Sequence, residues 1–297
     1  MEKVWFITGS SRGLGRSITK AVLENGDKVV ATARNTGLLQ DLEEQYSSQI
    51  LILSLDVSLK SQIHSTVEKA IAHFGRIDVL VNNAGFGITG STEAFTEEQV
   101  RSQLNVNLLA PIEITQTILP YMRKQRSGKI FQISSIGGRV GNAGLSIYQA
   151  AKFGLSGFSE SLRKEVEHLG IQVTSVEPGG FRTDWAGTSM TYAPFVEGYE
   201  ESIEQMKDFL SSGKFIPIGD PEKAAKVFID LVNHPQPPMH LVLGSEAASI
   251  LKKANEVRNE EFEQWLPVTL YTDHEDAAKF YETAEGKNYL IQKGIKL

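Results

Sequence analysis

The sequence predicts an α/β fold: a doubly wound parallel sheet of about seven strands with helices on both faces. Two observations support this prediction. Short apolar and β-branched runs alternate along the chain with amphipathic segments of helical length. Most of these runs are continuously apolar, as strands buried on both faces of a parallel sheet are. Repeated strand–helix units with right-handed crossovers build such a sheet.

The strands are expected at residues 4–8, 28–33, 50–55, 77–82, 129–134, 171–176 and 240–244. The helices between them are expected at residues 14–25, 36–47, 59–74, 97–125, 146–169 and 221–233. Residues 184–219 form a long insertion between a strand and a helix, and residues 245–297 form an extension that opens with another helix. We therefore expect one domain over residues 1–297, with a substrate lid at 184–219 and a C-terminal extension at 245–297.

Composition and charge exclude several classes of function. The formal net charge of −6 argues against a broad basic surface for nucleic acid or an anionic membrane. The chain has no cysteine, which excludes disulfides, thiolate zinc sites and cysteine nucleophiles. Its 6 histidines are scattered, so we expect no metal site. Because no run is long enough to span a membrane and the first residues lack the pattern of a signal peptide, the expected location is cytoplasmic.

A glycine-rich turn follows the first expected strand and opens the first expected helix. It reads TGSSRGLG and places Gly9, Gly13 and Gly15 in the order GxxxGxG. Glycine permits a tight turn and a close approach of the backbone to a pyrophosphate, while the helix N-terminus offers free N–H groups. Three glycines alone are a weak signal, but their position between a strand and a helix makes the signal strong. We expect a dinucleotide to bind here, against Gly9, Ser11, Gly13 and Leu14.

The residues after the second and third strands indicate which dinucleotide binds. A site selective for NAD presents an acidic residue at the end of the second strand, where it binds the ribose 2′-hydroxyl. Here Ala33 holds that position and Arg34 follows it, with Arg12 in the glycine turn. Two guanidinium groups suit a 2′-phosphate, which predicts NADP(H) as the cofactor unless both are ordinary surface arginines. Asp56, followed by Val57, is expected to accept a hydrogen bond from the adenine amine; the alternative is a charge at a helix N-terminus.

Tyr148 and Lys152 in the run YQAAK are the strongest candidates for catalysis. Their spacing places a phenol and an ammonium about one turn apart on one face of a helix. A free phenol, with a pKa of about 10, exchanges protons poorly at neutral pH, and a nearby cation lowers that pKa. Tyr148 would then serve as a general acid and base. The alternative is a pair of solvated side chains on a surface helix.

Six patterns occur in a fixed order along the chain: TGSSRGLG at 8–15, NNAG at 82–85, VNL at 106–108, ISS at 133–135, YQAAK at 148–152 and PGGFRT at 178–183. With these motifs in this order, the chain resembles the short-chain dehydrogenase/reductase family over residues 3–245. Within this family the sequence resembles NADP-dependent carbonyl and keto reductases, including 17β-hydroxysteroid and retinol dehydrogenase-like members. The resemblance implies a Rossmann-type sheet and an NADP(H)-dependent oxidoreductase.

The resemblance also implies a role for each catalytic candidate. Tyr148 would be the general acid and base, and Lys152 would lower its pKa and bind the ribose of the nicotinamide. Ser135 would form a hydrogen bond with the substrate oxygen. Asn107 would hold a water molecule that links Lys152 to solvent; Asn105 is the nearby alternative, but the register of VNL favours Asn107.

The remaining family motifs are expected to bind the cofactor, as Tyr148 and Lys152 would. Near the adenosine ribose these are Asn83, Ala84 and Gly85, and around the nicotinamide they are Pro178, Gly179, Phe181 and Thr183, the last in contact with the carboxamide. The catalytic serine and most of these residues follow strands, and the carboxyl ends of parallel strands line the ligand crevice. They are therefore expected to converge at one edge of the sheet.

The expected reaction is reversible hydride transfer between the nicotinamide and a carbonyl or secondary alcohol. An apolar and aromatic set in the insertion favours an apolar substrate: Trp185, Met190, Tyr192, Phe195, Tyr199, Met206, Phe209 and Phe215. The alternative is that these side chains only pack the insertion onto the body. Two other functions share the fold, an NADP-binding sensor or scaffold without catalysis and an epimerase or lyase. The resemblance further implies a homodimer or homotetramer formed through residues 97–125 and 146–169.

Overall fold

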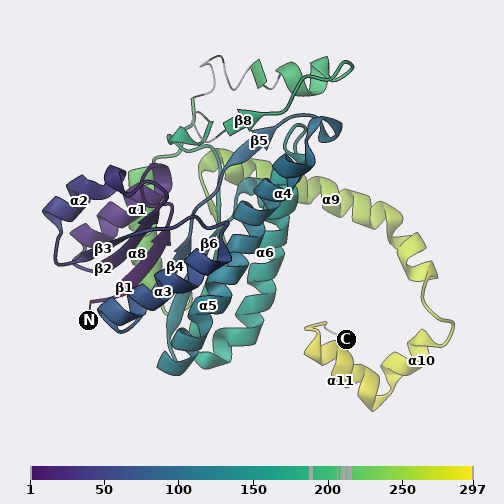
Figure 1. Ribbon diagram of the computed structural model, residues 1–297. Helices are drawn as coiled ribbons and strands as arrows, with labels where there is room; N and C mark the ends of the chain where they lie inside the picture. The colour runs from purple at the N-terminus through teal and green to yellow at the C-terminus, as the bar shows by residue number, and fades with distance from the viewer. Residues whose placement is uncertain (1, 187–189, 206, 209–211, 213–215, 296–297) are drawn as a thin grey trace. The chain divides into compact units, whose positions relative to one another are not determined.

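The computed structural model describes residues 2–186, 190–205, 207–208, 212 and 216–295 (Figure 1). The chain forms two compact units, Met1–Leu251 and Lys252–Leu297. The first unit contains the sheet and all the predicted catalytic and cofactor residues. The second lies within the extension predicted at residues 245–297.

Seven parallel strands form the central sheet, in the order β3-β2-β1-β4-β6-β7-β9. They are Val4–Thr8 (β1), Lys28–Ala33 (β2), Ile50–Ser54 (β3), Val79–Asn82 (β4), Gly128–Ile133 (β6), Ile171–Pro178 (β7) and His240–Leu243 (β9). Every pairing of neighbours in this sheet is parallel. The strand order reverses direction between β1 and β4, which is where ligands bind in doubly wound sheets. The predicted fold class is confirmed, and the predicted strands are all present with ends shifted by two residues at most.

Helices cover both faces of this sheet (Figure 1). One face carries α1 (Gly13–Glu24), α2 (Gln40–Gln45) and α8 (Pro221–Asn233), and the other carries α3 (Lys60–Phe74), α5 (Ala110–Gln125) and α6 (Ser146–Val166). Successive side chains of a strand point to opposite faces. In β1, Trp5 and Ile7 therefore join the core beneath α1 and α8, whereas Val4 and Phe6 join the core beneath α3 and α5. A continuously apolar strand thus supplies both cores.

The helix predicted over residues 97–125 is divided into two by a π-helical turn. α4 (Glu97–Leu104) leads into the turn Asn105–Leu109, and α5 follows. The N–H of Ala110 donates to the carbonyl of Asn105, so the turn contains one residue more than an α-helical turn. Such turns are common at functional sites, and this one carries Asn107.

A second sheet, of two parallel strands, joins distant segments that the sequence did not predict to pair. β5 (Gly87–Thr89) follows β4, and β8 (Met190–Tyr192) lies in the predicted lid. The Thr89 hydroxyl donates to the sulfur of Met190 at 3.2 Å. The described part of the lid is therefore fastened to the segment that follows β4.

The extension is helical. α9 (Ser245–Tyr271) is longer than the helix that the sequence predicts at its start, and α10 (Ala277–Glu282) and α11 (Ala284–Gln292) follow it. The Thr283 hydroxyl caps α11 by accepting a hydrogen bond from the N–H of Gly286 at 3.0 Å. Within the described ranges, no helix is both long enough and apolar enough to cross a membrane.

Candidate active site

The glycine turn after β1 has the backbone that a pyrophosphate requires. Gly9 has a φ of +68°, which strains any residue with a side chain. A Cβ atom on Gly15 would lie 2.2 Å from the carbonyl oxygen of Gly9, so only glycine permits this packing. The side-chain amide of Asn83 donates to the carbonyls of Thr8 (2.9 Å) and Gly9 (3.2 Å) and holds the turn against the end of β4. α1 begins at Gly13, so its N-terminal N–H groups face this turn.

Thr8 is a structural part of the site that the sequence interpretation missed. Its hydroxyl accepts hydrogen bonds from the backbone N–H groups of Asn83 (2.9 Å) and Ala84 (3.0 Å) and donates to the carbonyl of Val81 (3.4 Å). These bonds join the ends of β1 and β4 side by side. The only signal in the sequence is a hydroxyl residue that ends an otherwise apolar strand.

Arg12 and Arg34, which are predicted to bind the adenosine end of the cofactor, are both exposed. One carboxylate oxygen of Asp56 accepts from the backbone N–H (2.9 Å) and the hydroxyl (2.6 Å) of Ser58. The Ser58 hydroxyl lowers the pKa of Asp56 most, and the charge of Arg34 adds to that effect. One oxygen of Asp56 therefore serves a local turn shortly before α3, which begins at Lys60. The half-buried side chains of Leu14 and Val57 pack against the two cores, and Ser11 is half-buried in the glycine turn.

Tyr148 and Ser135 meet at the carboxyl end of β6. Tyr148 lies in the first turn of α6 and is 6% exposed. Burial raises the pKa of its phenol to about 12, and a hydrogen bond with the Ser135 side chain opposes that rise. Ser135 follows β6, and its hydroxyl oxygen also accepts from the N–H of Gly137 at 3.0 Å. The two hydroxyls therefore lie next to each other at this strand end.

Lys152 lies one turn after Tyr148 on the buried face of α6. Its ammonium donates to the carbonyl of Ile133 at 2.7 Å and lies 5.7 Å from the centre of the Tyr148 ring. Burial lowers the pKa of Lys152 to about 8. The expectation that Lys152 lowers the pKa of Tyr148 needs correction, because the loss of solvent around the phenol is the largest effect on it and raises that pKa.

Asn107 lies beside Lys152, and Asn105 does not. The Asn107 amide donates to the carbonyl of Phe86 at 2.9 Å and accepts from its N–H at 3.2 Å. A Cβ atom on Gly85 would lie 2.7 Å from the Asn107 amide oxygen and 3.8 Å from the Lys152 nitrogen. Gly85 therefore lets these two groups approach. Asn105 points instead to the carbonyl of Ser58, at 3.4 Å.

The segment after β7 lies against the glycine turn. Pro178 ends β7, and the N–H of Gly179 donates to the carbonyl of Leu243 in β9 at 2.9 Å. A Cβ atom on Gly13 would lie 3.3 Å from the Cβ of Thr183. The segment is held at its other side by a parallel bridge between Phe181 and residue 219. The groups predicted to converge therefore lie together at the carboxyl ends of β1, β4, β6 and β7.

One aromatic ring of the predicted lid packs against Tyr148. The Trp185 ring lies 5.4 Å from the Tyr148 ring, measured between centres, at an angle of 57°. Met190 is buried, whereas Phe195 is 54% exposed and therefore packs little of its side chain against the rest of the protein. The phenol of Tyr199 forms a hydrogen bond with Glu93, and Tyr192 is half-buried in β8. Met206, Phe209 and Phe215 lie outside the described residues.

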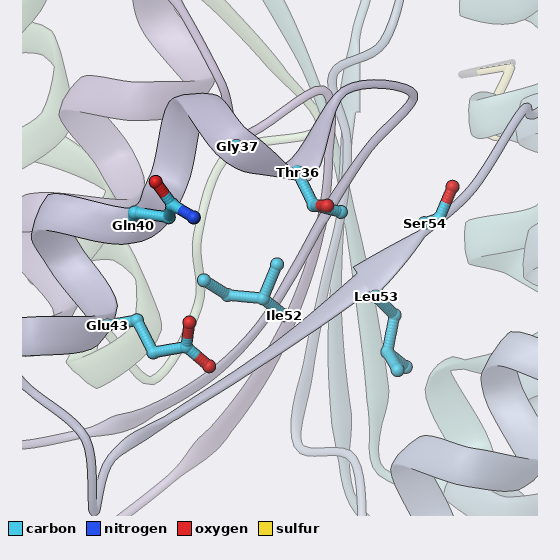
Figure 2. A pocket seen from close by; sticks show the side chains of 7 residues that line it. All are labelled: Thr36, Gly37, Gln40, Glu43, Ile52, Leu53 and Ser54. Carbon is cyan, nitrogen blue, oxygen red and sulfur yellow. The ribbon is translucent and has the colours of Figure 1, made fainter.

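A cavity elsewhere in the protein holds none of the residues predicted for the site. It has a volume of about 270 Å³ and is lined by Thr36, Gly37, Gln40, Glu43, Ile52, Leu53 and Ser54. Figure 2 shows Gln40 and Glu43 on one side and Ile52 on the other. These residues belong to β3, the edge strand of the sheet, and to the helical segment before it.

Comparisons with known proteins show the family to which the chain belongs. The family model for short chain dehydrogenase matches residues 3–192. Oxidoreductase BOA17 of Botryotinia fuckeliana is 40% identical over 271 residues, 91% of this chain and 99% of the relative. The 3-ketodihydrosphingosine reductase of Bacteroides thetaiotaomicron is 33% identical over 270 residues, 89% of this chain and 93% of the relative. A solved short-chain dehydrogenase from Streptomyces avermitilis has a TM-score of 0.88 at 36% identity, covering 92% of this chain and 100% of its own.

The family model spans most of the first unit, and these relatives align along nearly the whole chain. The protein therefore belongs to the short-chain dehydrogenase/reductase family of oxidoreductases.

Proposed function

We propose that this protein is an NADP(H)-dependent oxidoreductase that interconverts an apolar carbonyl compound and the corresponding secondary alcohol. The observation that carries the proposal is the cluster of Ser135, Tyr148 and Lys152 beneath the Trp185 ring. It combines a proton donor, a second hydroxyl for the substrate oxygen, a buried cation and an apolar wall.

The chain's own residues fit the dinucleotide. Gly9, Gly13 and Gly15 leave the backbone of the glycine turn without side chains, and the start of α1 suits a pyrophosphate. Thr183 lies beside Gly13 and would bind the carboxamide of the nicotinamide. Lys152 would bind the ribose next to that ring. When bound, NADPH supplies the hydride that reduces the carbonyl carbon.

Tyr148 supplies the proton. In reduction it donates its phenolic proton to the substrate oxygen as that oxygen gains negative charge, and Ser135 donates a second hydrogen bond to the same oxygen. The raised pKa of about 12 keeps the phenol protonated at neutral pH, as a general acid must be. Lys152 then returns a proton to the phenolate, and its lowered pKa of about 8 makes it a better donor than an ordinary lysine.

Lys152 regains its proton from solvent. Asn107 lies next to it, and the amide oxygen of Asn107 has a second lone pair beyond the one that accepts from Phe86. We therefore assign Asn107 to hold a water molecule on the path from Lys152 to solvent.

The choice of NADP(H) over NAD(H) rests on Arg12 and Arg34. Both are exposed near the end of β2, where Ala33 leaves no acidic group to bind a ribose hydroxyl. Arg34→Ala is expected to raise the KM for NADPH by about 10-fold or more and to leave the KM for NADH unchanged. Arg123→Ala, at an exposed position on α5, serves as the control. An equal rise for both cofactors would contradict the assignment.

The apolar nature of the substrate rests on the lid. Trp185 lies on Tyr148, and Met190 is buried where β8 pairs with β5. A ketone is also the substrate in the name of the Bacteroides relative. The test follows the loss of NADPH absorbance with bulky apolar ketones and with small anionic keto acids. We expect turnover of the apolar ketones; a preference for the keto acids would contradict the lid argument.

The same assay separates the other functions of this fold. Binding of NADPH without turnover of any carbonyl would indicate a sensor or scaffold. A cofactor that stays bound through purification and is not consumed would indicate an epimerase or lyase. We further propose a homodimer or homotetramer through residues 97–125 and 146–169, where Leu109 (49%) and Phe153 (42%) are exposed. Light scattering of the parent and of Phe153→Glu tests it, and a monomeric parent would contradict it.

A further inference from the structure

Glu177 is a fully buried charged residue for which the reaction above has no use. It lies in β7 with 0% exposure, directly before Pro178 and Gly179. A carboxylate is rarely buried in this way unless other groups satisfy it, because it loses its hydration. The groups that hold this carboxylate therefore indicate what it does.

Three segments of the chain meet on the Glu177 carboxylate. The Arg139 guanidinium lies 3.1 Å away, the Nδ1 of His240 lies 2.6 Å away, and the Ser175 hydroxyl donates at 3.2 Å. Arg139 follows the turn that begins at Ser135, and His240 opens β9. The Glu177 carboxylate thus connects the segment that follows Ser135 to β7, and β7 leads into the segment Pro178–Thr183 that is proposed to bind the nicotinamide.

His240 continues this network to the surface. Its Nε2 lies 2.8 Å from a carboxylate oxygen of Glu160, an exposed residue of α6. The inner contact, with Glu177, is made through Nδ1, and the outer contact, with Glu160, is made through Nε2. Substitutions of His240 can therefore remove one contact and keep the other.

We propose that Glu177 is a positioning residue for the cofactor, acting through Arg139 and the Nδ1 side of His240. It fixes the segment Pro178–Thr183 relative to Ser135, so that the nicotinamide and the substrate oxygen are placed together. This inference rests on the proposed function, in which that segment binds the nicotinamide. Glu160, at the outer end, is dispensable.

The first test measures the dissociation constant of NADPH by its fluorescence. Glu177→Gln keeps the shape of the side chain but turns an N–H toward groups that are themselves donors. We expect it to weaken NADPH binding by about 10-fold or more, as loss of one partner of a buried pair does. Glu160→Gln, at the exposed end, is expected to stay within about 2-fold of the parent. Unchanged binding in Glu177→Gln would overturn the proposal.

The second test uses two substitutions of His240 and does not depend on the folding of Glu177→Gln. The amide nitrogen of asparagine is separated from the backbone by the same number of bonds as the Nδ1 of histidine. The amide nitrogen of glutamine is separated from it by the same number of bonds as Nε2. His240→Asn should therefore keep the bond to Glu177 and bind NADPH within about 3-fold of the parent, whereas His240→Gln should weaken binding by about 10-fold. Equal effects of the two substitutions would overturn the inner-contact assignment.

The outcome also distinguishes this inference from the proposed function. If the parent binds and oxidises NADPH but the Glu177 and His240 variants bind it equally well, only the positioning role fails. If the parent does not bind NADPH, both fail together. A KM for NADPH that rises in Glu177→Gln while kcat with saturating cofactor falls less supports positioning over a direct part in the chemistry.

Discussion

Replacing Lys152 with methionine is expected to stabilise the protein at neutral pH while abolishing its activity. Lys152 is 5% exposed, and burial lowers its pKa from 10.5 to about 8. Methionine fills a similar space without a charge and adapts to irregular surroundings. The buried ammonium that the proposed reaction needs is thus a cost to folding.

The magnitude follows from the pKa. A shift from 10.5 to about 8 corresponds to about 3 kcal/mol of unfolding free energy at pH 7. Against this, the variant loses the hydrogen bond to the Ile133 carbonyl, which costs about 1 to 3 kcal/mol. The variant should therefore be more stable than the parent by about 1 kcal/mol at pH 7.

The pH dependence of this difference is the sharper test. The pKa of Lys152 is lower in the folded protein than in the unfolded one, so its contribution to stability rises as the pH rises from about 8 to 10.5. Above 10.5 the lysine is neutral in both states, and the cost of burying a charge is gone. The advantage of the variant should fall by about 3 kcal/mol across that range and become a disadvantage.

Urea unfolding of parent and variant, at pH 7 and at pH 10.5, measures this difference. Groups that titrate in both proteins cancel when the two are subtracted. Lys69→Met, at an exposed position on α3, is the matched control and should show no dependence of its difference on pH. If Lys152→Met and the parent differ in free energy of unfolding by the same amount at both pH values, the argument from the buried charge is wrong.

Four further outcomes are expected. Gly85→Ala places a Cβ atom 2.7 Å from the Asn107 amide oxygen and should lower kcat by about 10-fold or more; steady-state kinetics at parental levels would contradict this. Ser135→Ala removes the hydroxyl bound to Tyr148 and should lower kcat by about 100-fold, and an intact kcat would exclude the role given to it. Trp185→Ala should raise the KM for bulky apolar ketones by about 10-fold but not that for acetone, and equal changes would argue against an apolar wall. The reduction rate should decline as the pH rises through about 8, where Lys152 loses its proton, so a flat profile up to pH 9.5 would contradict its role.

Much of the site could be predicted because its signals are local. Gly9 and Gly15 are needed by the backbone around them, and Tyr148 and Lys152 share a helix face through their spacing alone. Ser135 follows an apolar strand, and the carboxyl ends of parallel strands meet at one edge. Local pattern and strand order together were therefore enough to bring these residues together.

What could not be predicted depends on contacts between distant segments. Thr8 bonds to the segment after β4, and Glu177 bonds to Arg139 and His240, with no local pattern to announce either. The pairing of β5 with β8 is of the same kind. The pKa of Tyr148 was misjudged for a related reason: the spacing shows a neighbouring cation, but only tertiary packing shows how fully the phenol is buried.

The most direct test of the account is NADPH oxidation by Tyr148→Phe with an apolar ketone, together with NADPH binding. Phenylalanine keeps the ring that packs against Trp185 and removes only the hydroxyl. Turnover should fall by about 1,000-fold or more while the dissociation constant of NADPH stays within about 3-fold of the parent. Turnover close to that of the parent, with binding intact, would contradict the assignment of Tyr148 as the proton donor.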